Sequence, residues 1–125
     1  MMSLAHIINP VRVNETSDLF IAQPITFSTM RTAKEFSKDT LDVNLYAIQY
    51  QDEVRITLPD CFIRVPDLTR SVADLKLFKK EKKLPLIGDI LDSLYDIADT
   101  DYLIYTNVDI ALQPYFYRSV SKIIE

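Results

Sequence analysis

Two apolar segments in the first half of the chain have the pattern of buried strands. Leu4–Asn9 is a short, mostly apolar run that stops at Pro10, and proline cannot continue a central strand. In the second segment, Asp42–Tyr50, alternation places apolar side chains on both faces: Val43, Leu45 and Ala47 on one, and Tyr46, Ile48 and Tyr50 on the other. Such a strand is typical of a parallel sheet that helices cover on two sides.

The residues between these strands predict a helix that follows the polar loop Asn14–Asp18. Thr26 or Ser28 can cap its N-terminus, since a hydroxyl side chain accepts a hydrogen bond from the first free backbone N–H groups. The apolar positions that follow recur at three-residue steps and share one face: Phe27, Met30, Ala33 and Phe36. Strand, helix and strand in this order indicate a right-handed crossover and the start of a parallel sheet.

The middle of the chain has weaker patterns. Cys61–Val65 lies between two prolines and predicts a third strand, with Cys61 as a small buried apolar residue. The lysine-rich segment Leu75–Leu84 is interpreted as a solvated helix or loop.

The clearest periodicity lies in Lys83–Asp101 and predicts a helix with Pro85 in its first turn. At about 100° per residue, its apolar side chains cover about half of the circumference. They are Leu84, Leu86, Ile87, Ile90, Leu91, Leu94, Tyr95, Ile97 and Ala98. The aspartates on the other side are expected to be solvated: Asp89, Asp92, Asp96 and Asp99. The pattern then changes to a nearly all-apolar strand at Tyr102–Tyr105.

These elements predict an α/β fold, a Rossmann-like three-layer α/β/α arrangement with a mainly parallel sheet. The 125 residues suit one domain, assigned to positions 1–125 because no linker or repeat interrupts them. Hydrophobic residues make up 48% of the chain and charged residues 26%, the balance of a soluble globular protein.

Charge and hydropathy exclude two classes of partner. A net charge of −4 gives no basic surface of the kind that nucleic-acid binding needs. No apolar run of the roughly 18 residues that a membrane span requires occurs, and the first residues lack a basic leader with an apolar stretch. The sequence therefore predicts a cytoplasmic protein without a transmembrane segment.

Three rare residues limit the chemistry. One cysteine and one histidine, His6, cannot form a zinc cluster, so a bound metal must be held by oxygen. His6 is expected to be a packed strand residue, because no partner for a catalytic histidine is identifiable. A single glycine, Gly88, excludes a glycine-rich phosphate loop.

Two oxygen-bearing side chains follow the last predicted strand. Asn107 and Asp109 come directly after Tyr102–Tyr105, and ligands of parallel sheets bind beyond the carboxyl ends of strands. Two such side chains, separated by one residue, suit a hard divalent cation that bridges a diphosphate. The alternative is an ordinary turn, since Asn and Asp are common turn residues.

The residues around this pair carry a resemblance to a known family. Asp99–Tyr117, DTDYLIYTNVDIALQPYFY, resembles the strand, the Asp-X-Asp-type motif and the following Pro-aromatic segment of glycosyltransferases with the GT-A fold, the nucleotide-diphospho-sugar transferase superfamily. Lys83–Ala98 is similar to the helix that precedes this motif. The first strand with Asn9–Val11, and the helix from about Thr26, match the family's first βαβ unit in order and spacing.

The resemblance implies a donor site. Asp109, with Asn107 as the weaker first member, would hold Mn²⁺ or Mg²⁺ against the diphosphate of a nucleotide sugar. Pro10 and Val11 would lie beside the nucleotide, and Asp52 would contact the base. Because the family's acceptor site and general base follow the motif, the resemblance assigns this chain the N-terminal nucleotide-binding half and no catalytic residue.

Two other hypotheses remain open. In the family, later strands cover the strand that corresponds to Tyr102–Tyr105, so an apolar edge here would invite pairing with a second copy. The chain would then be a non-catalytic or truncated α/β module that self-associates through this edge. The third hypothesis is an unrelated doubly wound nucleotide-binding or regulatory domain.

Overall fold

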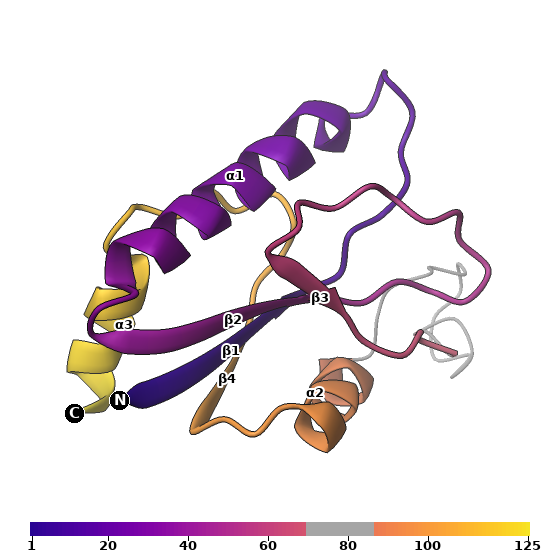
Figure 1. Cartoon of the computed structure of the whole chain (residues 1–125). Coiled ribbons are helices and arrows are strands. Elements are labelled where there is room, and N and C mark those ends of the chain that lie inside the picture. Colours follow the sequence, from indigo (N-terminus) through magenta and orange to yellow (C-terminus); the bar gives the residue numbers. More distant parts are fainter. Residues whose placement is uncertain (70–86) are drawn as a thin grey trace.

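The computed structural model describes residues 1–69 and 87–125, which form four strands and three helices (Figure 1). In chain order these are β1 (Met2–Ile8), α1 (Leu19–Ser37), β2 (Leu41–Ala47), β3 (Phe62–Arg64), α2 (Ile87–Ile97), β4 (Tyr102–Tyr105) and α3 (Phe116–Ile124). The predicted segment Leu75–Leu84, together with Pro85 and Leu86, lies outside the described residues.

The four strands form one parallel sheet in the order β3-β2-β1-β4. Leu4 of β1 pairs with Val43 of β2 on one side and with Tyr102 of β4 on the other. Helices α1 and α3 cover one face of this sheet and α2 the opposite face (Figure 1). The predicted three-layer α/β arrangement with a parallel sheet is therefore confirmed.

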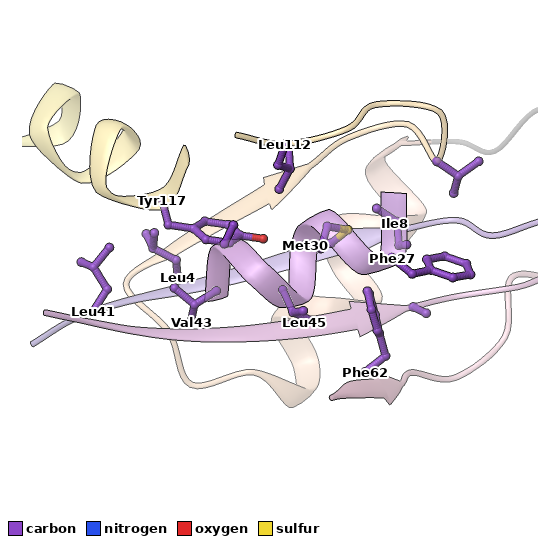
Figure 2. Close-up of a cluster of buried hydrophobic side chains, with 13 residues drawn as sticks. Leu4, Ile8, Phe27, Met30, Leu41, Val43, Leu45, Phe62, Leu112 and Tyr117 are labelled. Atoms are coloured by element: carbon purple, nitrogen blue, oxygen red, sulfur yellow. The ribbon is translucent and has the colours of Figure 1, made fainter. Parts of the chain in front are cut away.

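One hydrophobic cluster fills the space between the sheet and helices α1 and α3 (Figure 2). Alternate strand residues point into it, among them Leu4, Ile8 and Leu45, and Met30 of α1 meets them from above. Tyr117 of α3 is completely buried in the same cluster. Burial of each large apolar side chain stabilises the fold by about 1.5–3 kcal/mol relative to exposure.

A second cluster lies on the opposite face, beneath α2. The sheet supplies residues of the other alternation, including Ile7, Tyr46 and Ile48, and α2 supplies Ile90 and Leu94. The two faces of Asp42–Tyr50 therefore both pack against helices, as predicted, although regular strand pairing ends at Ala47.

The buried stripe of α2 is narrower than the sequence predicts. Ile90 and Leu94, one helical turn apart, are fully buried, whereas Ile87, Tyr95 and Ile97 are exposed. The prediction of a half-apolar buried face was wrong for these three residues, because the helix meets the sheet along a single line of side chains. The aspartates Asp92, Asp96 and Asp99 are exposed, as predicted, and Asp89 is half-buried.

The first helix begins earlier than predicted. It begins at Leu19 and contains Pro24, so neither Thr26 nor Ser28 is an N-cap. The Thr26 hydroxyl donates to the carbonyl of Ala22 at 3.1 Å, a bond within the helix. Gln23, the residue before Pro24, is buried and bonded to the backbone of Val11, a tertiary contact that offsets the hydrogen bond that proline cannot make.

Not all residues of the predicted apolar face of α1 are buried. Phe27, Met30 and Ala33 are buried, as expected, but Phe36 is 45% exposed. Phe36 lies at the end of α1, where Arg118 of α3 lies over its ring at 4.6 Å. Tyr115, the residue before α3, contacts the same ring at a centroid distance of 6.4 Å.

Candidate functional site at the ends of the parallel strands

The loop after β4 is held against the core by two apolar side chains. Val108 and Leu112 are both buried in the cluster beneath α1. The backbone N–H of Leu112 also donates to the Thr29 hydroxyl of α1 at 3.0 Å. Because Val108 points inward, its neighbours Asn107 and Asp109 are both exposed beyond the end of the strand.

Asn107 begins a turn. The N–H of Ile110 donates to the carbonyl of Asn107 at 3.4 Å, and the Tyr105 hydroxyl donates to the Asn107 side-chain oxygen, also at 3.4 Å. An amide oxygen has a second lone pair, so this contact leaves one for a further ligand. Residues 107–110 thus form a turn, and this turn presents both predicted oxygen-bearing side chains to solvent.

The predicted residues after β1 lie on the adjacent strand end. Ile7 pairs with Tyr105, so Asn9 and Asn107 each lie two residues beyond this pair. Pro10 follows and is buried, while Val11 is half-buried. The structure therefore brings Pro10 and Val11 to the same sheet edge as Asn107 and Asp109.

Val11 is fixed by a buried side chain of α1. The Gln23 side-chain oxygen accepts from the Val11 N–H at 2.8 Å, and its amide donates to the Val11 carbonyl at 2.7 Å. Gln23 thereby satisfies both backbone groups of Val11, much as a neighbouring strand would. The loop after β1 is joined to the first turns of α1 at this point.

Asp52 lies at the same end of the sheet, beyond the carboxyl end of β2. It belongs to the turn Tyr50–Glu53, in which the Glu53 N–H donates to the Tyr50 carbonyl at 3.2 Å. Tyr50 itself bridges to Leu68 on the β3 side of the sheet. Asp52 is exposed and follows β2, which lies two strands from β4, a separation of about 10 Å between strand axes.

Whether a cation can bind at the carboxyl ends of β1 and β4 depends on how many oxygen ligands are available there. No group of three or more His, Cys, Asp or Glu side chains that could hold a metal occurs in residues 1–69 and 87–125. Asn107 and Asp109 offer two oxygen ligands, and Mg²⁺ is commonly bound by one or two protein ligands together with substrate phosphates and water. The pair fits a cation that arrives with a diphosphate and does not fit a self-contained metal centre.

A buried polar chain lies directly behind this loop. His6 is completely buried, with Nδ1 2.6 Å from the Tyr117 hydroxyl and Nε2 2.6 Å from the hydroxyl of Thr106, the residue before Asn107. Burial lowers the pKa of His6 to about 4 and raises the pKa of the Tyr117 hydroxyl. A neutral imidazole donates through one nitrogen and accepts through the other, so it links the two hydroxyls. His6 is the packed strand residue that the sequence predicts.

A cavity with a volume of about 600 Å³ lies beside α1. The loop after β1, residues 20–31 of α1 and residues 56–59 line it. Of the five predicted site residues, Val11 alone contributes. Arg12 and Arg31 also line it, and sequence reasoning did not identify them because they are separated in the chain and match no motif.

Comparison of the chain with protein families, with curated proteins and with solved structures gives no match. Of the helices in the described parts of the chain, none combines the length and the apolar character that crossing a bilayer requires.

Proposed function

We propose that this chain is a glycosyltransferase-like domain that binds a nucleotide-diphospho-sugar at the carboxyl ends of β1 and β4. Transfer of the sugar would require an acceptor site beyond these residues. The observation that supports the proposal is the strand order. From β1 the chain proceeds outward through β2 to β3 and returns to the other side of β1 with β4. In open parallel sheets, ligands bind at such a reversal.

The residues at the reversal have the chemistry that a donor diphosphate needs. Asn107 and Asp109 are exposed on the loop after β4, next to Pro10 and Val11 after β1. Together with the diphosphate they would hold Mg²⁺ or Mn²⁺, which would stabilise the negative charge on the departing nucleoside diphosphate. Pro10 and Val11 would lie along the nucleotide.

Asp52 would contact the base from the adjacent part of the edge. The separation of about 10 Å between β2 and β4 is one that an extended nucleoside diphosphate can span. Buried polar residues hold the loops after β1 and β4. Gln23 fixes Val11 in the first loop, and His6 bonds to Thr106, next to Asn107, in the second. A site that is ordered before the ligand arrives reduces the entropic cost of binding.

Calorimetric titration with uridine and guanosine diphospho-sugars, with and without Mn²⁺, tests the proposal. We expect binding that requires Mn²⁺, and no detectable binding of Mn²⁺ alone, because the diphosphate completes the ligand set. Asp109→Ala should weaken donor binding by about tenfold or more, about 1.4 kcal/mol. Asp99→Ala removes an exposed aspartate that precedes β4, at the other end of the strand, and should leave binding unchanged. Failure of every donor to bind the unmodified chain would refute the proposal.

A second candidate function is self-association through β4. Among the described residues this strand is one of the two outer strands of the sheet, it carries no charged residue, and its Tyr102 is 43% exposed. An uncharged outer strand offers unpaired backbone groups to another chain. Sedimentation velocity should then show a concentration-dependent dimer that Tyr102→Lys disrupts and that Tyr95→Lys, on exposed α2 surface, does not. A monomer at every concentration would exclude this function.

A further inference from the structure

The cavity beside α1 has the size and lining of a small-molecule site. Its volume of about 600 Å³ lies within the range of about 300–1,000 Å³ that ligand pockets occupy. Most of its lining is apolar, including Phe20, Pro24 and Phe27 from α1 and Leu58 and Pro59 from the segment before β3. Such a surface gains free energy when an apolar group displaces water from it.

Two buried glutamines hold the lining segments in place. Gln23 fixes the backbone of Val11 on one side of the cavity. On the other side, Gln49 is 1% exposed, and its side-chain oxygen accepts from the Ile56 N–H at 3.3 Å and from Arg64 at 2.9 Å. Its amide donates to the carbonyl of Val54 at 3.2 Å. The cavity therefore lies between segments that are ordered without a ligand.

The charge at this cavity is positive. Arg12 of the loop after β1 and Arg31 of α1 line it, and no aspartate or glutamate of residues 1–69 and 87–125 does. Within the described part of the chain, neither guanidinium has a carboxylate within ion-pair distance. The Glu53 carboxylate accepts from the backbone N–H of Arg12, at 3.4 Å, and not from its guanidinium group. Unpaired guanidinium groups favour carboxylate and phosphate partners, which they bind with two parallel hydrogen bonds.

We propose that this cavity binds a small organic anion whose carboxylate or phosphate group lies between Arg12 and Arg31 and whose aromatic or branched apolar body packs against Phe20, Phe27 and Leu58. The apolar contacts and the two guanidinium groups recognise the two ends of the same molecule. Neither end alone uses both kinds of contact, so the proposal requires them to be joined in one ligand.

This site borders the donor site proposed above at Val11, but its two arginines and its apolar lining from α1 and residues 56–59 are not part of the donor site. Thr29, which bonds to the loop that carries Asp109, lies about half a turn of helix from Phe20, Phe27 and Arg31. The cavity and the loop after β4 therefore lie on opposite flanks of α1. Binding in the cavity needs neither Asp109 nor a cation, so its failure and failure of donor binding are distinguishable.

The proposal is tested by NMR titration of the ¹⁵N-labelled chain with four probes. Phenyl phosphate and phenylacetate carry a ring and an anion, inorganic phosphate carries only the anion, and benzyl alcohol carries only the ring. We expect saturable shifts of Val11, Ser28 and Thr57 with one or both of the first two probes, and at least tenfold weaker binding of the last two. The stronger of the first two identifies the phosphate or the carboxylate as the preferred group.

Three variants complete the experiment. Arg12→Gln with Arg31→Gln should weaken binding of the preferred probe at least tenfold, and Ser28→Trp, which fills the cavity from an exposed position of α1, should abolish it. Arg118→Gln, on α3, is the matched control and should leave binding unchanged, as should Asp109→Ala. Unchanged binding in the double variant, or no binding of either ring-bearing anion to the unmodified chain, would overturn the proposal. Urea unfolding of each variant verifies that it is folded.

Discussion

The hydroxyl oxygen of Tyr117 lies 2.6 Å from Nδ1 of His6, which joins the last helix to the first strand across 111 positions of the chain. Both side chains are fully buried, and their rings meet nearly edge to face at a centroid distance of 5.7 Å. The second ring nitrogen of His6 bonds to Thr106. A single imidazole thus joins β1, α3 and the start of the loop that carries Asn107 and Asp109.

Removal of the Tyr117 hydroxyl should destabilise the fold. Tyr117→Phe keeps the buried ring but leaves Nδ1 of His6 without its partner, and an unsatisfied buried polar group costs about 1–3 kcal/mol. Urea denaturation measures this change in the free energy of unfolding. Tyr115→Phe, on a side chain that is 52% exposed, is the control and should change stability by less than about 0.5 kcal/mol. Equal effects in the two variants would contradict the role of the hydrogen bond.

Acid should weaken the fold through His6. Burial holds the folded-state pKa at about 4, below the value of 6.5 in an unfolded chain. Above pH 6.5 the imidazole is neutral in both states and stability is unaffected. As the pH falls from 6.5 to 4 only the unfolded state gains the proton, so stability decreases by about 3 kcal/mol and then levels off.

The chain has one histidine, so the NMR titration of its imidazole signals reports this pKa directly. We expect a midpoint near 4 in the folded protein. Urea unfolding at several pH values should show a steeper acid-side loss for the unmodified chain than for His6→Gln, which does not titrate. A midpoint near 6.5 would contradict the proposed environment of His6.

Loss of the Gln23 side-chain amide should release the loop after β1. Gln23→Leu preserves the approximate size of the side chain but removes both bonds to Val11, with an expected cost of about 1–3 kcal/mol. Hydrogen exchange of the Val11 amide should accelerate by at least tenfold, since its acceptor is gone. Gln113→Leu, at an exposed position, is the matched control, and an unchanged Val11 exchange rate in Gln23→Leu would refute the role of Gln23.

Truncation of a buried side chain of α2 should lower the stability of the fold. Leu94 is completely inaccessible, and Leu94→Ala should lower the free energy of unfolding by about 2–5 kcal/mol because it leaves a cavity beneath the helix. The next residue, Tyr95, is 76% exposed, and Tyr95→Ala should cost less than about 0.5 kcal/mol. Chemical denaturation of the two variants compares them, and similar losses would show that α2 does not pack as described.

Alternation of apolar residues predicted the sheet well. Leu4–Asn9 and Asp42–Tyr50 were identified because residues of both faces are apolar, and the structure covers both faces with helices. Helix boundaries were less predictable. α1 begins before Pro24 because tertiary contacts outweigh the missing N–H, and α3 was not predicted because its apolar side chains gain their partners only from distant segments.

The candidate site, like the fold, has parts that the sequence predicts and parts that it does not. The sequence placed Asn107 and Asp109 at the end of a strand, because a change of periodicity marks where an apolar strand gives way to a polar loop. It gave no sign that Gln23 would hold Val11, or that Arg12 and Arg31 would line one cavity. Such relationships depend on which strand ends and helix flanks become neighbours, and that is a property of the packed sheet.

The sequence by itself determined the fold class, the two-faced burial of the central strands and the position of the oxygen-bearing pair, since each follows from the local order of apolar and polar residues. Only the tertiary structure decided the strand order, the buried chain from Tyr117 through His6 to Thr106, and the cavity beside α1. The physical reason is range: periodicity acts over a few residues, whereas these contacts join groups up to 111 positions apart, and only a closed core brings them within hydrogen-bonding distance.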